Sequence, residues 1–194
     1  MANVNAPRGF KPVKLVTNEP YNGGYATYRI ASGYASNIFS GDVVKMITSG
    51  YINVAAPGDQ MRGVAVGFRW INSAGSPVVF PYWPAGTVTL AGQDAQVFVI
   101  DDPNMVFEAV LGNSTSAPAI SNIGKTYQSY TGSGGGSLGS GLSAEGADFT
   151  TLATGAQQWR LLDFVQRVDN DPTSAYSRGL FTPALHDLRV NTGI

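Results

Sequence analysis

The feature that most constrains the fold is a repeated pattern of short apolar segments, each bounded by glycine, proline, asparagine or aspartate. From Tyr25 onward these segments recur about every 8–12 residues. The clearest spans residues 61–70, where Val64, Val66, Phe68 and Trp70 alternate with other residues. Alternation with a period of two places such side chains on one face of a β-strand. The pattern predicts an all-β protein with a single sandwich or barrel-like domain over residues 25–194.

Residues 1–24 differ from this pattern and predict an extended N-terminal arm. Three prolines, at positions 7, 12 and 20, disfavour a helix here. We expect the arm to dock on a larger assembly or an adjacent subunit instead of completing the core of its own domain. The alternative is that it forms the first strand of its own domain. The contact candidates are Arg8, Phe10, Lys11, Val13, Lys14 and Leu15.

Two later segments are harder to interpret from pattern alone. Residues 131–147 (TGSGGGSLGSGLSAEGA) carry few apolar side chains to offset the entropy cost of ordering, so they predict a Gly/Ser-rich surface loop outside the β-core. Residues 157–168 fit one face of a helix slightly better than one face of a strand, and this choice stays open at this point.

Charge and composition narrow the class of partner. Only 13% of residues are charged, against about 25% in a typical domain, and neutral surface suits burial in an assembly. The net charge is −1, with scattered basic residues, which argues against nucleic-acid binding.

The chain has no cysteine, and its start lacks the apolar core of a signal peptide. No apolar run approaches the ~20 residues of a membrane helix. We therefore expect a soluble protein made in a cytoplasm, with neither nucleic acid nor membrane as partner.

Candidate catalytic groups are few. His186 is the one histidine, and no nucleophile motif such as G-x-S-x-G surrounds it. The acidic runs at residues 101–104 and 169–172 each contain an Asp-Pro step typical of turns. Four aromatic residues, Trp70, Phe80, Tyr82 and Trp83, are interpreted as part of a β-core or a protein interface, with a carbohydrate-binding or base-stacking platform as the alternative. The sequence thus predicts no enzyme, no catalytic residue, no cofactor and no metal.

Seven segments spread along the chain carry a resemblance to one family. They are APRGFKPV (6–13), YRIASG (28–33), IFSGDVV (38–44), RGVAVGF (62–68), VFVIDDPN (97–104), LLDFVQRVDN (161–170) and LHDLR (185–189). Together they resemble structural proteins of tailed-phage virions of the capsid decoration type, also called cement or head-stabilising proteins. The resemblance implies a β-rich protein, commonly trimeric, on the outside of the shell where capsomers meet. It also favours a strand at residues 157–168 and transfers no catalytic residue.

The predicted function follows from these points together. We expect a non-enzymatic capsid decoration protein that binds the outer shell between capsomers and stabilises the head of a bacteriophage. Its expected partners are the major capsid protein and further copies of itself in a homotrimer, and its expected location is the capsid exterior of the virion. The alternatives are another virion component, from the tail, neck or baseplate, and a carbohydrate-binding adhesion module.

Overall fold

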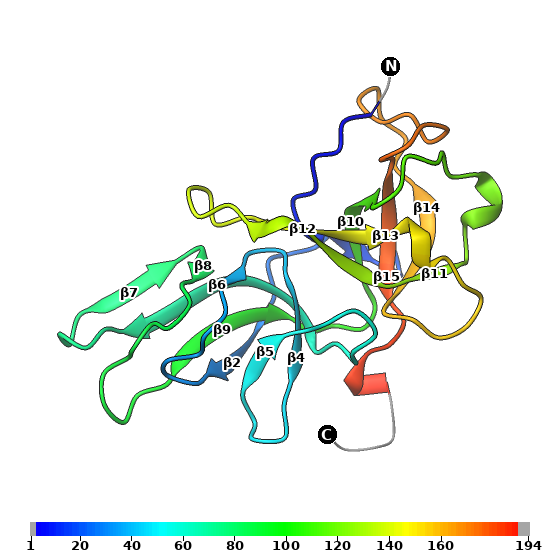
Figure 1. The fold of residues 1–194 in the computed structure, drawn as a ribbon. Helices are drawn as coiled ribbons and strands as arrows, with labels where there is room; N and C mark the ends of the chain where they lie inside the picture. Colours follow the sequence, from blue (N-terminus) through cyan, green and yellow to red (C-terminus); the bar gives the residue numbers. More distant parts are fainter. Residues whose placement is uncertain (1–2, 190–194) are drawn as a thin grey trace.

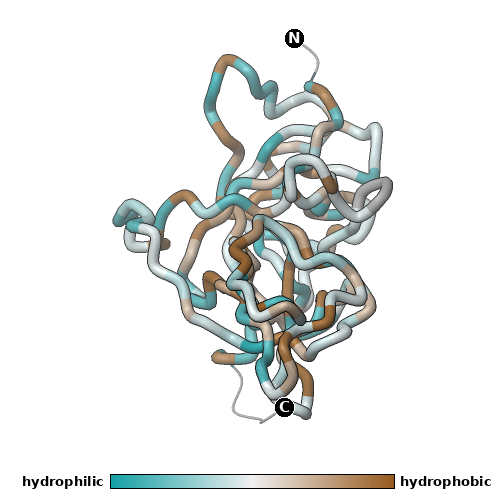
Figure 2. Tube along the Cα trace, turned by 90° about the vertical axis from the view of Figure 1, so that its left-hand side faces the viewer, coloured by the Kyte–Doolittle hydropathy of each residue, from teal (hydrophilic) through white to brown (hydrophobic). Residues whose placement is uncertain are grey.

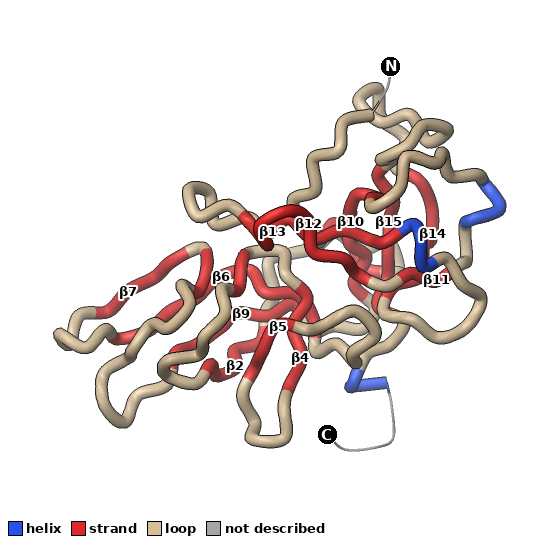
Figure 3. The backbone as a smooth tube through the Cα atoms, in the orientation of Figure 1, coloured by secondary structure: helices blue, strands red, loops and turns tan. Residues whose placement is uncertain are grey.

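The structure, a computed structural model, describes residues 3–189, except for the side chains of residues 132–134. This part of the chain holds fifteen β-strands and three short 3-10 helices, η1 (Ile120–Asn122), η2 (Phe149–Thr151) and η3 (Asp187–Arg189) (Figure 1). The predicted all-β fold class is confirmed. Figure 3 shows the strands gathered into two sheet regions, joined by long loops.

The first sheet is antiparallel and curls toward a barrel. Its two end strands, β2 and β5, contact each other, so the sheet is nearly closed. A two-stranded ribbon of β3 (Ile38–Phe39) and β8 (Tyr82–Trp83) lies against β6. In spatial order the strands are β2 (Ala26–Ile30), β9 (Ala95–Ile100), β6 (Gly63–Ile71), β4 (Val43–Met46) and β5 (Ile52–Val54), with β7 (Pro77–Phe80) paired to the far end of β6.

The second sheet is built around β10 (Met105–Gly112). On one side β10 pairs antiparallel with β15, and it also pairs with β1 and, in parallel, with β13. The remaining strands continue the sheet at both ends. The strands are β11 (Thr126–Tyr127), β14 (Trp159–Phe164), β15 (Arg178–Pro183), β10, β13 (Ser143–Asp148) and β12 (Ser129–Gly136), with β1 (Lys11–Leu15) attached to β10.

Two apolar cores hold the sheets. One fills the barrel-like sheet, where the rings of Trp70 and Trp83 meet edge to face with centroids 5.4 Å apart. The other packs side chains of the second sheet, such as Phe107 and Trp159, against Val64 and other residues of the first sheet. In Figure 2, several strongly apolar stretches run through the middle of the trace. Because the second core takes residues from both sheets, it joins them.

The N-terminal segment corrects one sequence prediction. Strand β1 pairs antiparallel with β10, with Lys11 opposite Glu108 and Leu15 opposite Met105. Phe10 is 1% exposed and stacks on Trp159, with ring centroids 3.9 Å apart. The expectation that this segment docks outward instead of completing the core of its own domain is wrong for Phe10, which is buried in that core. The alternative interpretation, a first strand of its own domain, is correct for Lys11–Leu15.

The glycine-rich stretch corrects a second prediction. Most of residues 131–147 belong to the hairpin of β12 and β13, and only residues 137–142 form the loop between the two strands. Its glycines allow close packing: a Cβ on Gly146 would lie 2.7 Å from the carbonyl oxygen of Val110, and one on Gly136 would lie 2.4 Å from the Phe39 ring. The expected loop outside the β-core is therefore wrong, because these glycines serve close approach and not flexibility.

The ambiguous segment 157–168 contains a strand, β14, as the family resemblance implied. Its pairing with β15 shifts register between Leu161 and Asp163. Such an irregularity breaks the period-two alternation of a strand. This shift explains why the apolar spacing in the sequence fitted a helix.

Candidate functional site

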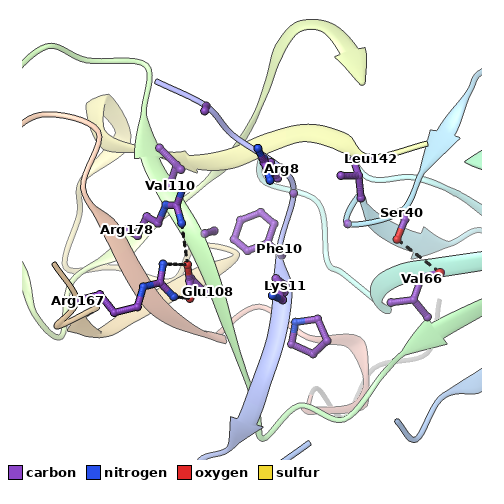
Figure 4. A pocket seen from close by; sticks show the side chains of 15 residues that line it. Arg8, Phe10, Lys11, Ser40, Val66, Glu108, Val110, Leu142, Arg167 and Arg178 are labelled. Atoms are coloured by element: carbon purple, nitrogen blue, oxygen red, sulfur yellow. Dashed lines mark hydrogen bonds and ion pairs between the residues drawn. The ribbon is translucent and has the colours of Figure 1, made fainter. Parts of the chain in front are cut away.

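A cavity of about 370 Å³ lies where the N-terminal segment crosses between the two sheets (Figure 4). Three of the predicted contact residues, Arg8, Phe10 and Lys11, line it. Opposite them stand Arg167 and Arg178, from the turn after β14 and the start of β15. The other lining residues are Ala6, Gly9, Pro12, Ser40, Gly41, Val66, Glu108, Ala109, Val110 and Leu142.

Glu108, on β10, fixes the two arginines on one wall of the cavity. Its carboxylate accepts two hydrogen bonds from the Arg167 guanidinium, both at 3.0 Å, and Arg178 Nη1 lies 3.5 Å from the same group. Arg167 Nε also donates to Asp169 Oδ1 at 2.9 Å, and this hydrogen bond holds the pKa of Asp169 below its ordinary value. A bidentate ion pair of this kind fixes the plane of the guanidinium and the directions of its remaining N–H donors.

The cavity is positively charged at its rim and apolar beneath. Four basic side chains line it, Arg8, Lys11, Arg167 and Arg178. Glu108 and the neighbouring Asp169 pair with the last two of these, so the net positive charge comes from Arg8 and Lys11. Arg8 and Lys11 are exposed. The remaining wall includes apolar side chains, of which Leu142 is 39% exposed. This combination suits an extended, acidic polypeptide segment with one or two apolar side chains, since charges steer approach and apolar contacts add affinity.

The other three predicted contact residues lie elsewhere on β1. Val13 is 38% exposed. The Lys14 ammonium donates to Asn18 Oδ1 at 2.7 Å. Leu15 packs against the second core and lines a different cavity, with Glu19 and Asp101. The structure thus brings together three of the six candidates and separates the rest.

His186 is a buried structural residue. It is 1% exposed, and its Nδ1 accepts a hydrogen bond from the backbone N–H of Leu188 at 3.2 Å. Burial lowers the pKa of His186 to about 4, so the imidazole is neutral at pH 7. The adjacent Asp187 pairs with Arg62 instead, with Nε and Oδ2 2.9 Å apart. His186 is not among the residues that line the cavity beside β1.

The acidic turns behave as their sequences predict. Asp102 Oδ1 accepts a hydrogen bond from the backbone N–H of Asn104 at 2.7 Å, and Asp171 Oδ1 accepts one from Thr173 at 2.9 Å. Both contacts close tight turns. Across the described range 3–189, no three His, Asp or Glu side chains converge in a way that could hold a metal ion.

The aromatic cluster does not form a platform of four rings. Trp83 is fully buried and Trp70 is 7% exposed, so both belong to the first core. Phe80 is 39% exposed and lies 4.9 Å from the half-buried Tyr82, measured between ring centroids. The β-core interpretation therefore holds for the two tryptophans.

The sequence interpretation missed the arginine wall of the cavity. Glu108 lies on β10, Arg167 in the turn after β14 and Arg178 on β15, and no local motif connects them.

No protein-family model matches the chain, and searches of curated proteins and of solved structures found no significant match. Within residues 3–189, no helix has the length and apolar character needed to cross a membrane.

Proposed function

We propose that this protein is a non-enzymatic decoration protein of a tailed-phage capsid, which binds the outside of the shell between capsomers and stabilises the head. The observation that carries the proposal is the positively charged cavity beside β1, whose basic rim and apolar wall suit a polypeptide partner. The motif resemblance along the chain supports the same reading. The partner is the major capsid protein, through an extended acidic segment of its outer surface.

The cavity offers two kinds of contact to that segment. Arg8 and Lys11 are exposed and supply long-range attraction, which depends on salt because exposed charges are screened within about 10 Å at 0.1 M salt. Individual exposed ion pairs contribute only about 0–1 kcal/mol. Contacts with the apolar wall, including Leu142, therefore carry most of the affinity, and the charges mainly set the association rate.

The protein acts as a homotrimer placed where capsomers meet. Strand β7 supports self-association, because among the described strands it pairs only with β6 and leaves its other edge unpaired. Val79 on this edge strand is 72% exposed. An unpaired edge with exposed apolar side chains can pair with another copy of the chain. Light scattering tests this part, and a stable monomer that also fails to assemble on shells would contradict it.

The central test measures binding to shells of the encoding phage that lack this protein. We expect Arg8→Glu and Lys11→Glu together to slow association strongly. Arg69→Glu with Arg160→Glu is the control matched in charge, since both arginines are exposed, on β6 and β14, and neither lines the cavity. If the cavity variant and this control bind shells equally well, the cavity is not the contact surface.

Copy number separates this role from other virion roles. In complete particles, a decoration protein should approach the copy number of the major capsid protein, whereas a tail, neck or baseplate component should be far scarcer. Quantitative gel densitometry or mass spectrometry of purified particles decides between them. Absence from the particle would contradict the proposal as a whole.

A further inference from the structure

Two carboxylates lie buried together where the two sheets join. Asp42, just before β4, is 4% exposed, and Glu145, on β13, is 2% exposed. Both line a cavity of about 210 Å³, which Asn37 and Thr131 also line. Buried carboxylates are almost always neutralised by a proton, a basic side chain or a metal ion. No lysine or arginine is among the described residues that line this cavity.

Backbone donors hold one oxygen of each carboxylate. Asp42 Oδ2 accepts a hydrogen bond from the N–H of Phe39, and Glu145 Oε2 accepts one from the N–H of Val43, both at 2.7 Å. The second oxygen of Asp42, Oδ1, is buried and has no hydrogen-bond partner in the described part of the chain. A buried acceptor without a partner costs about 1–3 kcal/mol, which a ligand at this oxygen would offset.

Two negative charges buried beside one cavity repel each other, because the protein interior screens charges poorly. A cation between Asp42 and Glu145 would remove this repulsion.

We propose that Asp42 and Glu145 bind a calcium ion at the junction of the two sheets. Ca²⁺ accepts six to eight oxygen ligands in irregular arrangements, including water. Asp42 Oδ1 and the Glu145 carboxylate supply the charged ligands. Thr131 lies opposite Glu145 in the β12–β13 pairing, which places a hydroxyl-bearing residue beside them. The cavity also has room for several waters, at about 30 Å³ each.

A site with only two carboxylates should bind Ca²⁺ weakly, because calcium affinity rises with the number of charged ligands. With two of them, we expect a dissociation constant in the range of about 0.1–1 mM, as in extracellular calcium modules. Mg²⁺ fits less well, because it demands near-octahedral geometry and gives up water reluctantly. The site departs from the expectation of a metal-free protein, and calcium binding there does not require that the protein binds a capsid.

Thermal unfolding of the purified protein tests the site. We would compare calcium-free buffer with increasing CaCl₂, at constant ionic strength and pH 7.5, and run MgCl₂ in parallel. At free Ca²⁺ about ten times the dissociation constant, the unfolding equilibrium constant of the wild-type protein should fall roughly tenfold. Calorimetric titration should find one site per chain.

Two isosteric variants and one control complete the experiment. Asp42→Asn and Glu145→Gln should lose the calcium response, whereas Asp163→Asn, which changes an exposed carboxylate on β14, should keep it. A wild-type protein that does not respond to Ca²⁺ overturns the proposal, as does a full response in either variant. An equal response to Mg²⁺ overturns the assignment to calcium. Because the wild-type titration stands alone, the test holds even if a variant fails to fold.

Discussion

Replacing Phe10 with alanine tests the position of the N-terminal segment most directly. The ring is 1% exposed, stacks on Trp159 at 3.9 Å and meets the edge of Phe181 at 6.3 Å, measured between centroids. Removal of a buried phenylalanine ring costs about 3–5 kcal/mol. Rigid aromatic neighbours limit how far this site can collapse, so we expect about 4 kcal/mol. For a chain of this length, that loss corresponds to a melting temperature lower by roughly 8–16 °C.

Urea and thermal unfolding of the wild-type and variant proteins measure this loss. Phe10→Leu should cost markedly less, because it retains most of the apolar volume. Val16→Ala changes a side chain that is 52% exposed and should stay within about 0.5 kcal/mol of wild type. Deletion of residues 2–16 should destabilise the fold strongly, because it removes Phe10 and β1. A loss below about 1 kcal/mol for Phe10→Ala would refute the core assignment, since a buried ring cannot be removed so cheaply.

Three further predictions follow from buried groups. Burial raises the pKa of Asp42 from its ordinary value of 3.8 to about 6 in the folded protein. Between these two pH values, in calcium-free buffer, the folded protein holds a proton that the unfolded chain has released. The wild-type free energy of unfolding should therefore fall as pH rises through this window. The stability of Asp42→Asn relative to wild type should therefore rise there, by up to about 3 kcal/mol, and a difference that is flat with pH would contradict this account. Gly146→Ala should cost about 1–3 kcal/mol by chemical denaturation, because its Cβ would meet the Val110 carbonyl, while Gly139→Ala, with only the Ser137 hydroxyl 3.9 Å away, should stay near wild type. His186→Ala should lower the free energy of unfolding by about 1–3 kcal/mol through the lost contact with Leu188, and an unchanged melting temperature would show that the imidazole is not buried as described.

The sequence predicted the parts of the fold that depend on local periodicity. Alternation over residues 61–70 corresponds to β6, which spans Gly63–Ile71, and the same logic located β9 and β10. The two wrong predictions depend on distant partners. Phe10 looked like a free anchor because Trp159, which covers it, lies far along the chain. The glycine-rich composition of residues 131–147 indicated a flexible loop. Glycine is also the residue that allows two strands to approach closely, and composition alone does not distinguish the two uses.

The proposed contact surface could be predicted only on its N-terminal side for the same physical reason. The basic and apolar residues at positions 8–11 are adjacent in sequence, so their chemistry was visible as a cluster. Glu108, Arg167 and Arg178 meet them only through the pairing of β10 with β1 and β15. The carboxylate pair is a similar case, because Asp42 precedes one sheet and Glu145 belongs to the other.

The two candidate sites are structurally connected at the junction of the sheets. The backbone N–H of Gly9 donates to the carbonyl of Glu145 at 3.1 Å, and the N–H of Phe10 donates to the carbonyl of Gly41 at 3.0 Å. The residues that border the basic cavity are thus held by the same two segments that carry the buried carboxylates. A Cβ on Gly9 would lie 2.6 Å from Gly41, so the two backbones are in close contact and leave no room for a side chain at position 9. An ion bound between Asp42 and Glu145 would join the segment before β4 to β13, and through these hydrogen bonds it would stabilise the N-terminal wall of the proposed contact surface.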